Sequence, residues 1–148
     1  MLRFKIFNSS NLITDQERTE IIDFLHNHLD QFRDTKEAIG MAIAYAMSER
    51  PGPGGFVLQG KLDDDIVGAV VINKTGMEGY IPENILVYIA VDQKFRGKGY
   101  GKELMMKALE LAEGDVKLHV EYDNPARHLY EKLGFTSKYM EMRLAKNK

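Results

Sequence analysis

The sequence predicts a single α/β domain, residues 1–148, built around one central sheet. Two patterns lead to this fold class. Between residues 14 and 47, apolar side chains recur every three or four positions, as in amphipathic helices. Further on, Ile66–Ile72 and Ile85–Val91 are continuous apolar runs, far shorter than a membrane span and typical of buried strands. No linker or internal repeat divides the chain, so one domain is expected.

The first half is expected to form one strand and two helices. Phe4–Phe7 fits a short strand. Thr14 and Glu17 have the spacing of a capping box, so a helix should begin directly after Thr14. A second helix should begin near Asp34 and end at the proline- and glycine-rich segment Ser48–Gly55. The apolar stripe of the first helix consists of Ile21, Leu25, Leu29 and Phe32, and that of the second of Ile39, Ile43 and Met47.

The second half is expected to alternate between strands and helices. The polar turn Asp63–Asp65 joins Phe56–Gln59 to the β-branched run Ile66–Ile72 as a hairpin. Ile85–Val91 should be a central strand that is covered on both faces. The elements predicted after it are a helix with Leu104, Ala108 and Leu111, a strand with Val116, Leu118 and Val120, a helix over Asn124–Lys132 capped by Asn124, and a last strand over Thr136–Leu144.

The composition excludes several classes of chemistry. The chain has no cysteine, which rules out disulfides, a thiolate nucleophile and Cys-ligated zinc. Histidines and carboxylates do not cluster at ligand spacing, so no metal is expected. With 20 Lys+Arg against 22 Asp+Glu, the net charge of −2 argues against nucleic acid as a partner. The N-terminus lacks a signal-peptide pattern and no segment is long enough to span a bilayer, so we expect a cytoplasmic protein with no membrane partner.

The glycine-rich turn after the central strand predicts a phosphate site. Gly97, Gly99 and Gly101 alternate there with neighbouring cations, which are Arg96, Lys98 and Lys102. Glycines let backbone amides converge, and the N-terminus of the following helix adds partial positive charge. The alternative is a tight turn on a solvated basic edge. The turn is neither a P-loop, which needs Ser or Thr directly after its lysine, nor a dinucleotide fingerprint, because the third glycine is not at the required spacing.

Two motifs resemble those of the GNAT acetyltransferases. Arg96-x-x-Gly99-x-Gly101, placed after an apolar strand, is similar to the acyl-CoA signature of that family. The segment that runs from Asn124 through Tyr130 to Gly134-Phe135 is similar to its later motif. The resemblance implies a mixed central sheet of about six strands, with two central strands splayed apart and helices on both faces.

The resemblance also implies an activity and a set of site residues. The donor would be acetyl-CoA and the acceptor a primary amine of a small molecule or a peptide, with direct transfer in a ternary complex. Backbone groups of Ile89, Ala90 and Val91 would hold the pantetheine, while Asn124 would cap its helix and contact the same group. Tyr130 would donate a proton to the departing thiolate, unless it is a packing residue. The pyrophosphate would lie on the amides of Arg96, Gly97, Lys98, Gly99, Tyr100, Gly101 and Lys102.

The general base stays open at this stage. The best-known members of the family carry a glutamate within the fourth strand, where this sequence has Ile85. Glu83 would share its face by the two-residue period of a strand. Glu121, at the end of the fifth strand, is the competing candidate, and His119 is the third. An ordered water could also carry the proton.

Two other functions fit the same motifs. A non-catalytic acyl-CoA sensor would keep the glycine-rich turn without needing Tyr130 or a base. A plain nucleotide-binding module would bind ATP as well as CoA. The sequence does not identify the acceptor, and a homodimer is compatible with an enzyme of this size.

Overall fold

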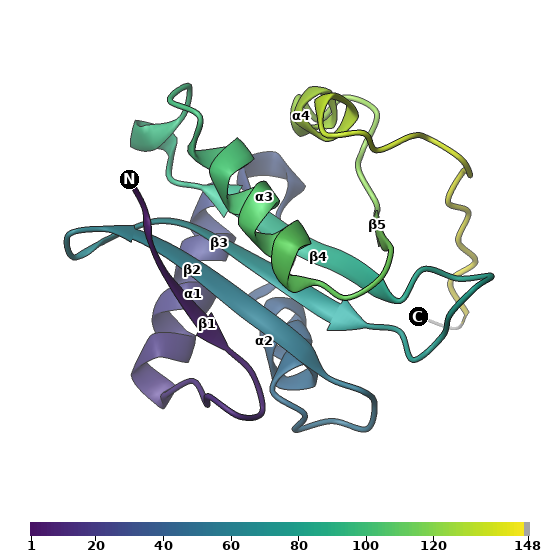
Figure 1. Cartoon of the computed structure of the whole chain (residues 1–148), viewed down its shortest axis with the longest axis horizontal. Helices are drawn as coiled ribbons and strands as arrows, with labels where there is room; N and C mark the ends of the chain where they lie inside the picture. The colour runs from purple at the N-terminus through teal and green to yellow at the C-terminus, as the bar shows by residue number, and fades with distance from the viewer. Residues whose placement is uncertain (147–148) are drawn as a thin grey trace. The chain divides into compact units, whose positions relative to one another are not determined.

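The computed structural model describes residues 1–146. The chain divides into two compact units, Met1–Leu118 and His119–Lys148. The first unit holds the sheet and three helices (Figure 1). Its strands are β1 (Arg3–Phe7), β2 (Gly55–Leu62), β3 (Asp65–Lys74), β4 (Asn84–Val91) and β5 (Val116–Leu118). Its helices are α1 (Asp15–His28), α2 (Lys36–Ala46) and α3 (Tyr100–Leu111), with the short 3₁₀ turns η1 (Asp30–Phe32) and η2 (Gln93–Phe95).

The sheet confirms the predicted α/β class, with five strands in place of about six. Its order is β1-β2-β3-β4-β5, antiparallel throughout except for the parallel pair of β4 and β5. That last pairing joins only Asn84, Ile85 and Leu86 to β5. Beyond Leu86, no strand of the first unit lies along this edge of β4. β5 ends at Leu118, opposite Leu86, so its pairing covers only the first three residues of β4.

A β-bulge lies in β4 at the point where the pairing with β5 ends. Ile72 faces Leu86 and Val71 faces Tyr88, so Val87 is an extra residue without a partner on β3. A bulge of this kind redirects the side chains that follow it. Leu86 lies opposite Ile72, whereas Tyr88 and Ala90 lie on the face that packs with Val71.

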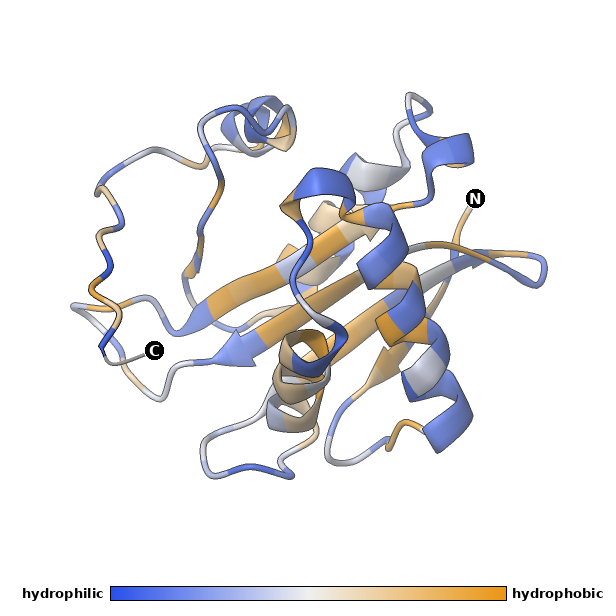
Figure 2. Cartoon of the chain, turned by 180° about the vertical axis from the view of Figure 1, so that it is seen from behind, coloured by the Kyte–Doolittle hydropathy of each residue, from blue (hydrophilic) through white to orange (hydrophobic). Residues whose placement is uncertain are grey.

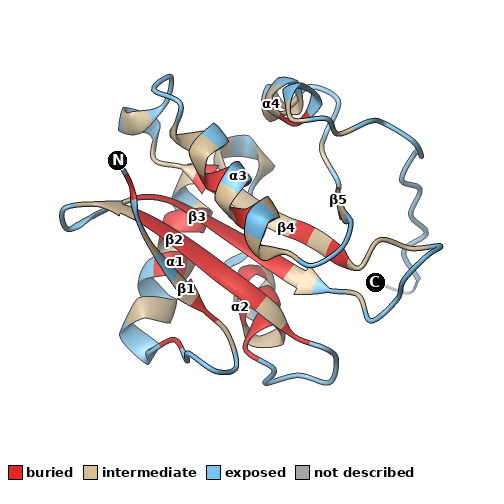
Figure 3. Cartoon of the chain, viewed as in Figure 1, coloured by how far each residue is buried: buried red, intermediate tan, exposed pale blue. Residues whose placement is uncertain are grey.

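Helices cover both faces of the sheet in the first unit. Helices α1 and α2 pack on one face and α3 packs on the other, and the buried residues concentrate in the central strands between them (Figures 1 and 3). Figure 2 shows the same strands as the most hydrophobic part of the unit. The core beneath α1 and α2 includes Phe7, Ile21, Leu25, Ile39, Ile43, Val57 and Val71.

Local sequence signals account for the ends of these helices. The capping box predicted at Thr14 is present: its hydroxyl accepts from the Glu17 amide at 3.1 Å, and the Glu17 carboxylate accepts from the Thr14 amide at 3.0 Å. Helix α2 begins after Thr35, whose hydroxyl accepts from the Ala38 amide at 3.1 Å. None of the helices in residues 1–146 is both long and apolar enough to cross a membrane.

The second unit contains α4 (Ala126–Lys132) but not the predicted last strand. The side-chain oxygen Oδ1 of Asn124 accepts from the Ala126 amide at 2.9 Å, but the N-cap residue of α4 is Pro125, so the helix begins later than the predicted start at Asn124. Residues 136–146 form no strand, and their apolar side chains, including Tyr139 and Met142, are exposed. The prediction for Thr136–Leu144 is wrong because alternation alone does not make a strand: the backbone groups also need a neighbouring strand to pair with.

Candidate active site

The turn between β4 and α3 owes its shape to two glycines in the left-handed region. Gly97 has φ 78° and Gly99 has φ 87°. A Cβ added at either position would meet no atom within 4 Å, so the backbone conformation is what requires glycine here, not lack of space. Ahead of them, the Asp92 carboxylate accepts from the Lys94 amide at 3.0 Å and starts the 3₁₀ turn η2.

The N-terminus of α3 presents backbone amides without protein acceptors. Its N-cap is Gly99, which has no side chain to cap it, unlike Thr14 of α1 and Thr35 of α2. Within residues 1–146, the amides from Gly97 to Lys102 donate no hydrogen bond to a protein acceptor. The helix dipole adds partial positive charge at the same place. This end of α3 is therefore suited to bind an anion through its backbone.

Two of the three predicted cations are also available at this end of the helix. In the part of the chain that the structure describes, no carboxylate lies within 4 Å of the ammonium group of Lys98 or Lys102. Both side chains are exposed. Together with the amides of Gly97–Lys102, they meet the needs of a pyrophosphate, which has several charged oxygens to satisfy.

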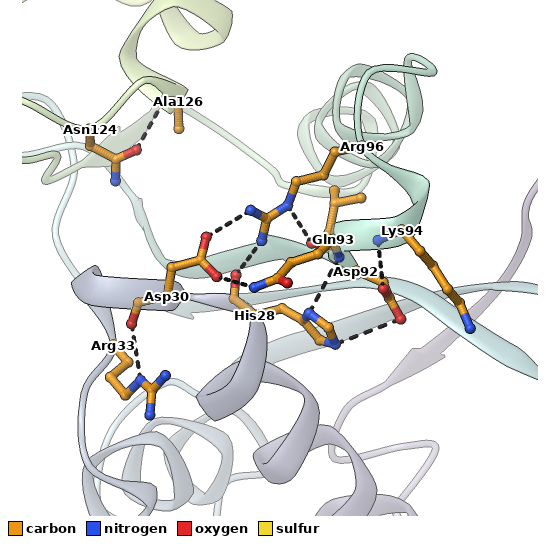
Figure 4. A network of polar contacts seen from close by, with 10 residues as sticks. His28, Asp30, Arg33, Asp92, Gln93, Lys94, Arg96, Asn124 and Ala126 are labelled. Atoms are coloured by element: carbon orange, nitrogen blue, oxygen red, sulfur yellow. Dashed lines mark hydrogen bonds and ion pairs between the residues drawn. The ribbon is translucent and has the colours of Figure 1, made fainter.

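The side chain of Arg96 has other partners (Figure 4). Its guanidinium donates to the Val91 carbonyl at 2.9 Å, the His28 carbonyl at 2.7 Å and the Asp30 carboxylate at 2.7 Å. Its backbone amide faces the Gln93 carbonyl at 3.4 Å. Arg96 thus fastens the turn to the segment that joins α1 and α2, while Lys98 and Lys102 carry the available charge.

The partner of Arg96 is an unusual aspartate. Asp30 has φ 57°, which aspartate tolerates better than most side chains. Its carboxylate also accepts from the Gln93 side chain at 2.7 Å. The hydrogen bond from Arg96, supported by Gln93, lowers the pKa of Asp30. Asp30 therefore stays ionised at neutral pH and keeps the turn in place.

The part of β4 beyond its pairing with β5 contains the residues predicted to hold the pantetheine. Ile89 and Ala90 pair with Val70 and Ala69 of β3 on one side, and they lie beyond the last pair with β5 on the other. Val91 follows, and its carbonyl accepts from Arg96. A strand edge without a partner offers backbone donors and acceptors to an extended ligand.

Glu83 immediately precedes β4 and is already engaged. Its Oε1 accepts from the Asp115 amide at 2.7 Å, and this bond lowers the pKa of the Glu83 carboxyl. The carboxylate lies against Gly114, where an added Cβ would come within 2.6 Å of Oε1. These contacts stabilise the turn between α3 and β5. A carboxylate with a lowered pKa is also a weak proton acceptor.

The remaining predicted site residues belong to the second unit. The Tyr130 ring packs on Phe135 with centroids 6.0 Å apart. Burial, followed by the nearby Glu121 carboxylate, raises the pKa of Tyr130 to about 12, so the phenol keeps its proton. Glu121 accepts from the Asn124 side-chain amide at 3.2 Å. The second unit therefore supplies a protonated phenol and an exposed carboxylate.

Two polar pairs in the first unit were not predicted from the sequence. Asp30 joins Arg96 across 66 residues, and Asp34 accepts from the Tyr88 hydroxyl at 2.6 Å across 54 residues. Tyr88 stood inside an apolar run that indicated only a buried strand. The one sequence feature that could have indicated a polar role is that Tyr88 directly precedes Ile89, the first residue expected to hold the pantetheine.

Comparisons with known proteins agree with this geometry. Residues 14–135 match the acetyltransferase (GNAT) family. The SPbeta prophage-derived uncharacterized N-acetyltransferase YokL of Bacillus subtilis (strain 168) is 37% identical over 83 residues, which are 49% of this chain and 43% of that protein. This chain thus aligns with less than half the length of that relative.

Solved structures share the fold at lower identity. The crystal structure of PH1933 from Pyrococcus horikoshii OT3 superposes with a TM-score of 0.69 at 24% identity, covering 95% of this chain and 93% of that one. A ribosomal-protein-alanine N-acetyltransferase from Brucella melitensis biovar Abortus 2308 gives 0.62 at 17% identity, covering 98% and 99%. Because the family match covers most of the sequence, from α1 to the end of the later motif, the chain belongs to the acetyltransferase (GNAT) family.

Proposed function

We propose that the protein is an N-acetyltransferase that transfers the acetyl group of acetyl-CoA directly to a primary amine. The observation that most supports this proposal is the uncapped N-terminus of α3. In residues 1–146, the amides of Gly97–Lys102 donate to no protein acceptor, and the ammonium groups of Lys98 and Lys102 pair with no carboxylate. Such an arrangement fits the pyrophosphate of CoA. Membership of the family supports the acyl donor.

The predicted site residues have separate roles in this proposal. Backbone groups of Ile89, Ala90 and Val91 orient the thioester along the edge of β4, beyond the end of its pairing with β5. Preorganised amides suit an oxygen on which charge develops, because they need no reorientation. The amine nitrogen forms a bond to the acyl carbon, the carbon–sulfur bond breaks, and the products are an amide and the free thiol. Tyr130 supplies the proton to sulfur. The proton that the amine loses passes to a base or to water and is returned to Tyr130 through solvent, so atoms and charge balance.

The candidate bases differ in how well they suit this step. Glu83 is the least suited, because its carboxylate already accepts from the Asp115 amide and its pKa is lowered. Glu121 is exposed and accepts from Asn124 through Oε1, and its Oε2 accepts no hydrogen bond from residues 1–146. We therefore propose Glu121, or a water in its place, as the proton acceptor for the amine.

Binding and turnover measurements test the proposal together. Calorimetric titration with CoA should give about tenfold weaker binding for Lys98→Gln or Lys102→Gln, since a charge-assisted hydrogen bond contributes about 1.5 kcal/mol. Lys107→Gln is the matched control, because this lysine of α3 pairs with Glu110 at 3.0 Å. Acetyl transfer is then measured as the release of free thiol from acetyl-CoA in the presence of each of a panel of primary amines.

Each alternative function gives a different result. A sensor would bind acetyl-CoA tightly and release no thiol with any amine. A nucleotide-binding module would gain as much thermal stability from ATP as from CoA. Equal CoA affinity in the wild type and both lysine variants would contradict the proposed pyrophosphate site.

A further inference from the structure

Tyr88 and Asp34 form a polar pair close to the point in β4 where its pairing with β5 ends. The Tyr88 hydroxyl donates to Asp34 Oδ2 at 2.6 Å. Tyr88 lies two residues beyond Leu86, the last residue of β4 that pairs with β5. Asp34 lies between η1 and α2, in the segment that Arg96 holds through Asp30. Tyr88 therefore directly precedes Ile89 and Ala90 along β4, where the acyl group is proposed to bind.

The bulge at Val87 explains why Tyr88 reaches Asp34. Because Val87 has no partner on β3, Tyr88 lies opposite Val71 and packs against the core beneath α1 and α2. Its hydroxyl reaches the edge of that core, where Asp34 is exposed. The phenol is held on one side by apolar packing, and the carboxylate opens to solvent.

The cations nearest to Asp34 in sequence are directed elsewhere. Arg33 donates through Nε to the Asp30 carbonyl at 3.0 Å, and Lys36 pairs with Asp23 at 2.9 Å. Across residues 1–146, no basic group lies within 4 Å of the Asp34 carboxylate, and Tyr88 gives its one hydrogen bond. A carboxylate can accept about four hydrogen bonds. Asp34 thus keeps unused acceptor capacity and an uncompensated negative charge.

The protonation state of Tyr88 allows its phenol oxygen to accept a hydrogen bond from a ligand. Burial, followed by the bond to Asp34, raises the pKa of Tyr88 above its ordinary value of 10.0. The phenol therefore stays protonated at neutral pH, donates to Asp34 and keeps an oxygen lone pair that can accept from a second donor. An ammonium group has three donors and no acceptor, which matches one carboxylate oxygen and one phenol oxygen.

We infer that Asp34 and Tyr88 bind the primary ammonium of the acceptor and select cationic amines that carry no carboxylate next to the reacting nitrogen. The inference rests on the proposed acetyltransferase function, and it names the class of acceptor. A carboxylate beside the amine would face Asp34 and be repelled. Diamines fit these requirements and α-amino acids do not.

Direct binding tests the inference separately from turnover. Calorimetric titration of 1,4-diaminobutane into the CoA-saturated protein should give at least tenfold weaker binding for Asp34→Asn and a severalfold loss for Tyr88→Phe. CoA affinity should stay within twofold in both variants. Glu37→Gln is the matched control, because it removes an exposed carboxylate from the first turn of α2 and should leave diamine binding within twofold. Glycine should bind far more weakly than the diamine.

The outcomes separate the two proposals. Equal diamine affinity in the wild type and in Asp34→Asn, or preference for glycine, overturns the amine site even if acetyl transfer occurs. Diamine binding that depends on Asp34, without thiol release for any amine, supports the amine site and contradicts the proposed acetyltransferase activity. Asp34 is exposed, so its variant should fold; circular dichroism checks this, and Asp34→Asn alone decides if Tyr88→Phe is destabilised.

Discussion

Arg96 and Asp30 are joined by an ion pair of 2.7 Å that links the glycine-rich turn to the segment between α1 and α2. Both side chains are more than one-third exposed, so solvent screens much of their attraction. The guanidinium gains further hydrogen bonds from the carbonyls of Val91 and His28. The pair thus positions two parts of the proposed site at the same time.

The first prediction concerns Asp30→Asn, which keeps a side chain that tolerates positive φ and removes the charge. We expect a loss of about 0.5–1 kcal/mol in the free energy of unfolding at pH 7. Because the pKa of Asp30 is lowered, its contribution is present above the ordinary value of 3.8 and disappears as the pH falls through the folded value below it. Urea titrations from pH 7 to pH 3 should therefore show the two proteins converging at the acid end. A constant difference across this range would contradict the assignment.

The second prediction separates backbone conformation from packing at two glycines. Gly99→Ala should lower the free energy of unfolding by about 1–2 kcal/mol. The position has room for a Cβ, but its φ of 87° is unfavourable for alanine. Gly40→Ala, within α2, should stabilise by about 0.5–1 kcal/mol, since an added Cβ would lie 3.6 Å from Ile22 Cδ1 in ordinary contact. Thermal unfolding of both variants checks the opposite signs. CoA affinity should fall in Gly99→Ala alone.

The third prediction tests Tyr130 as the proton donor. Tyr130→Phe keeps the ring on Phe135 and removes the hydroxyl, so kcat should fall about 100-fold while CoA affinity stays within twofold. Because the pKa of Tyr130 is about 12, its ionisation should add no falling limb to the rate profile between pH 6 and pH 10. Tyr122→Phe, an exposed tyrosine of the same unit, is the control. Unchanged kcat in Tyr130→Phe would leave this residue a packing role.

The fourth prediction assigns Glu83 to structure. Glu83→Gln should lower the melting temperature at pH 7, because the Asp115 amide loses a charged acceptor, and kcat should change less than threefold. The lowered pKa means that the contribution exists above the ordinary value of 4.5 and is lost as the pH falls through the folded value. Glu78→Gln, in the same loop, is the matched control. A drop of 100-fold in kcat at unchanged stability would instead make Glu83 the general base.

Sequence patterns predicted those features that depend on neighbouring residues. The capping box at Thr14, the helix stripe through Ile21 and Leu25, and the glycine-rich turn all depend on short-range rules. The ion pair of Arg96 with Asp30 depends on how α1 packs against β4, which no local pattern encodes. The predicted strand over Thr136–Leu144 failed for the related reason that strand formation requires a partner.

The bulge in β4 has a consequence for how this family member can diverge. Val87 is one inserted residue, and it decides on which face of the sheet Tyr88 lies. Deletion of Val87 would restore regular pairing and leave Tyr88 opposite Val71, on the face it occupies now. A β4 of the same length without the bulge would instead place Val87 opposite Val71 and turn Tyr88 away from Asp34. The bulge, and not the number of residues in β4, therefore decides whether this pair can form.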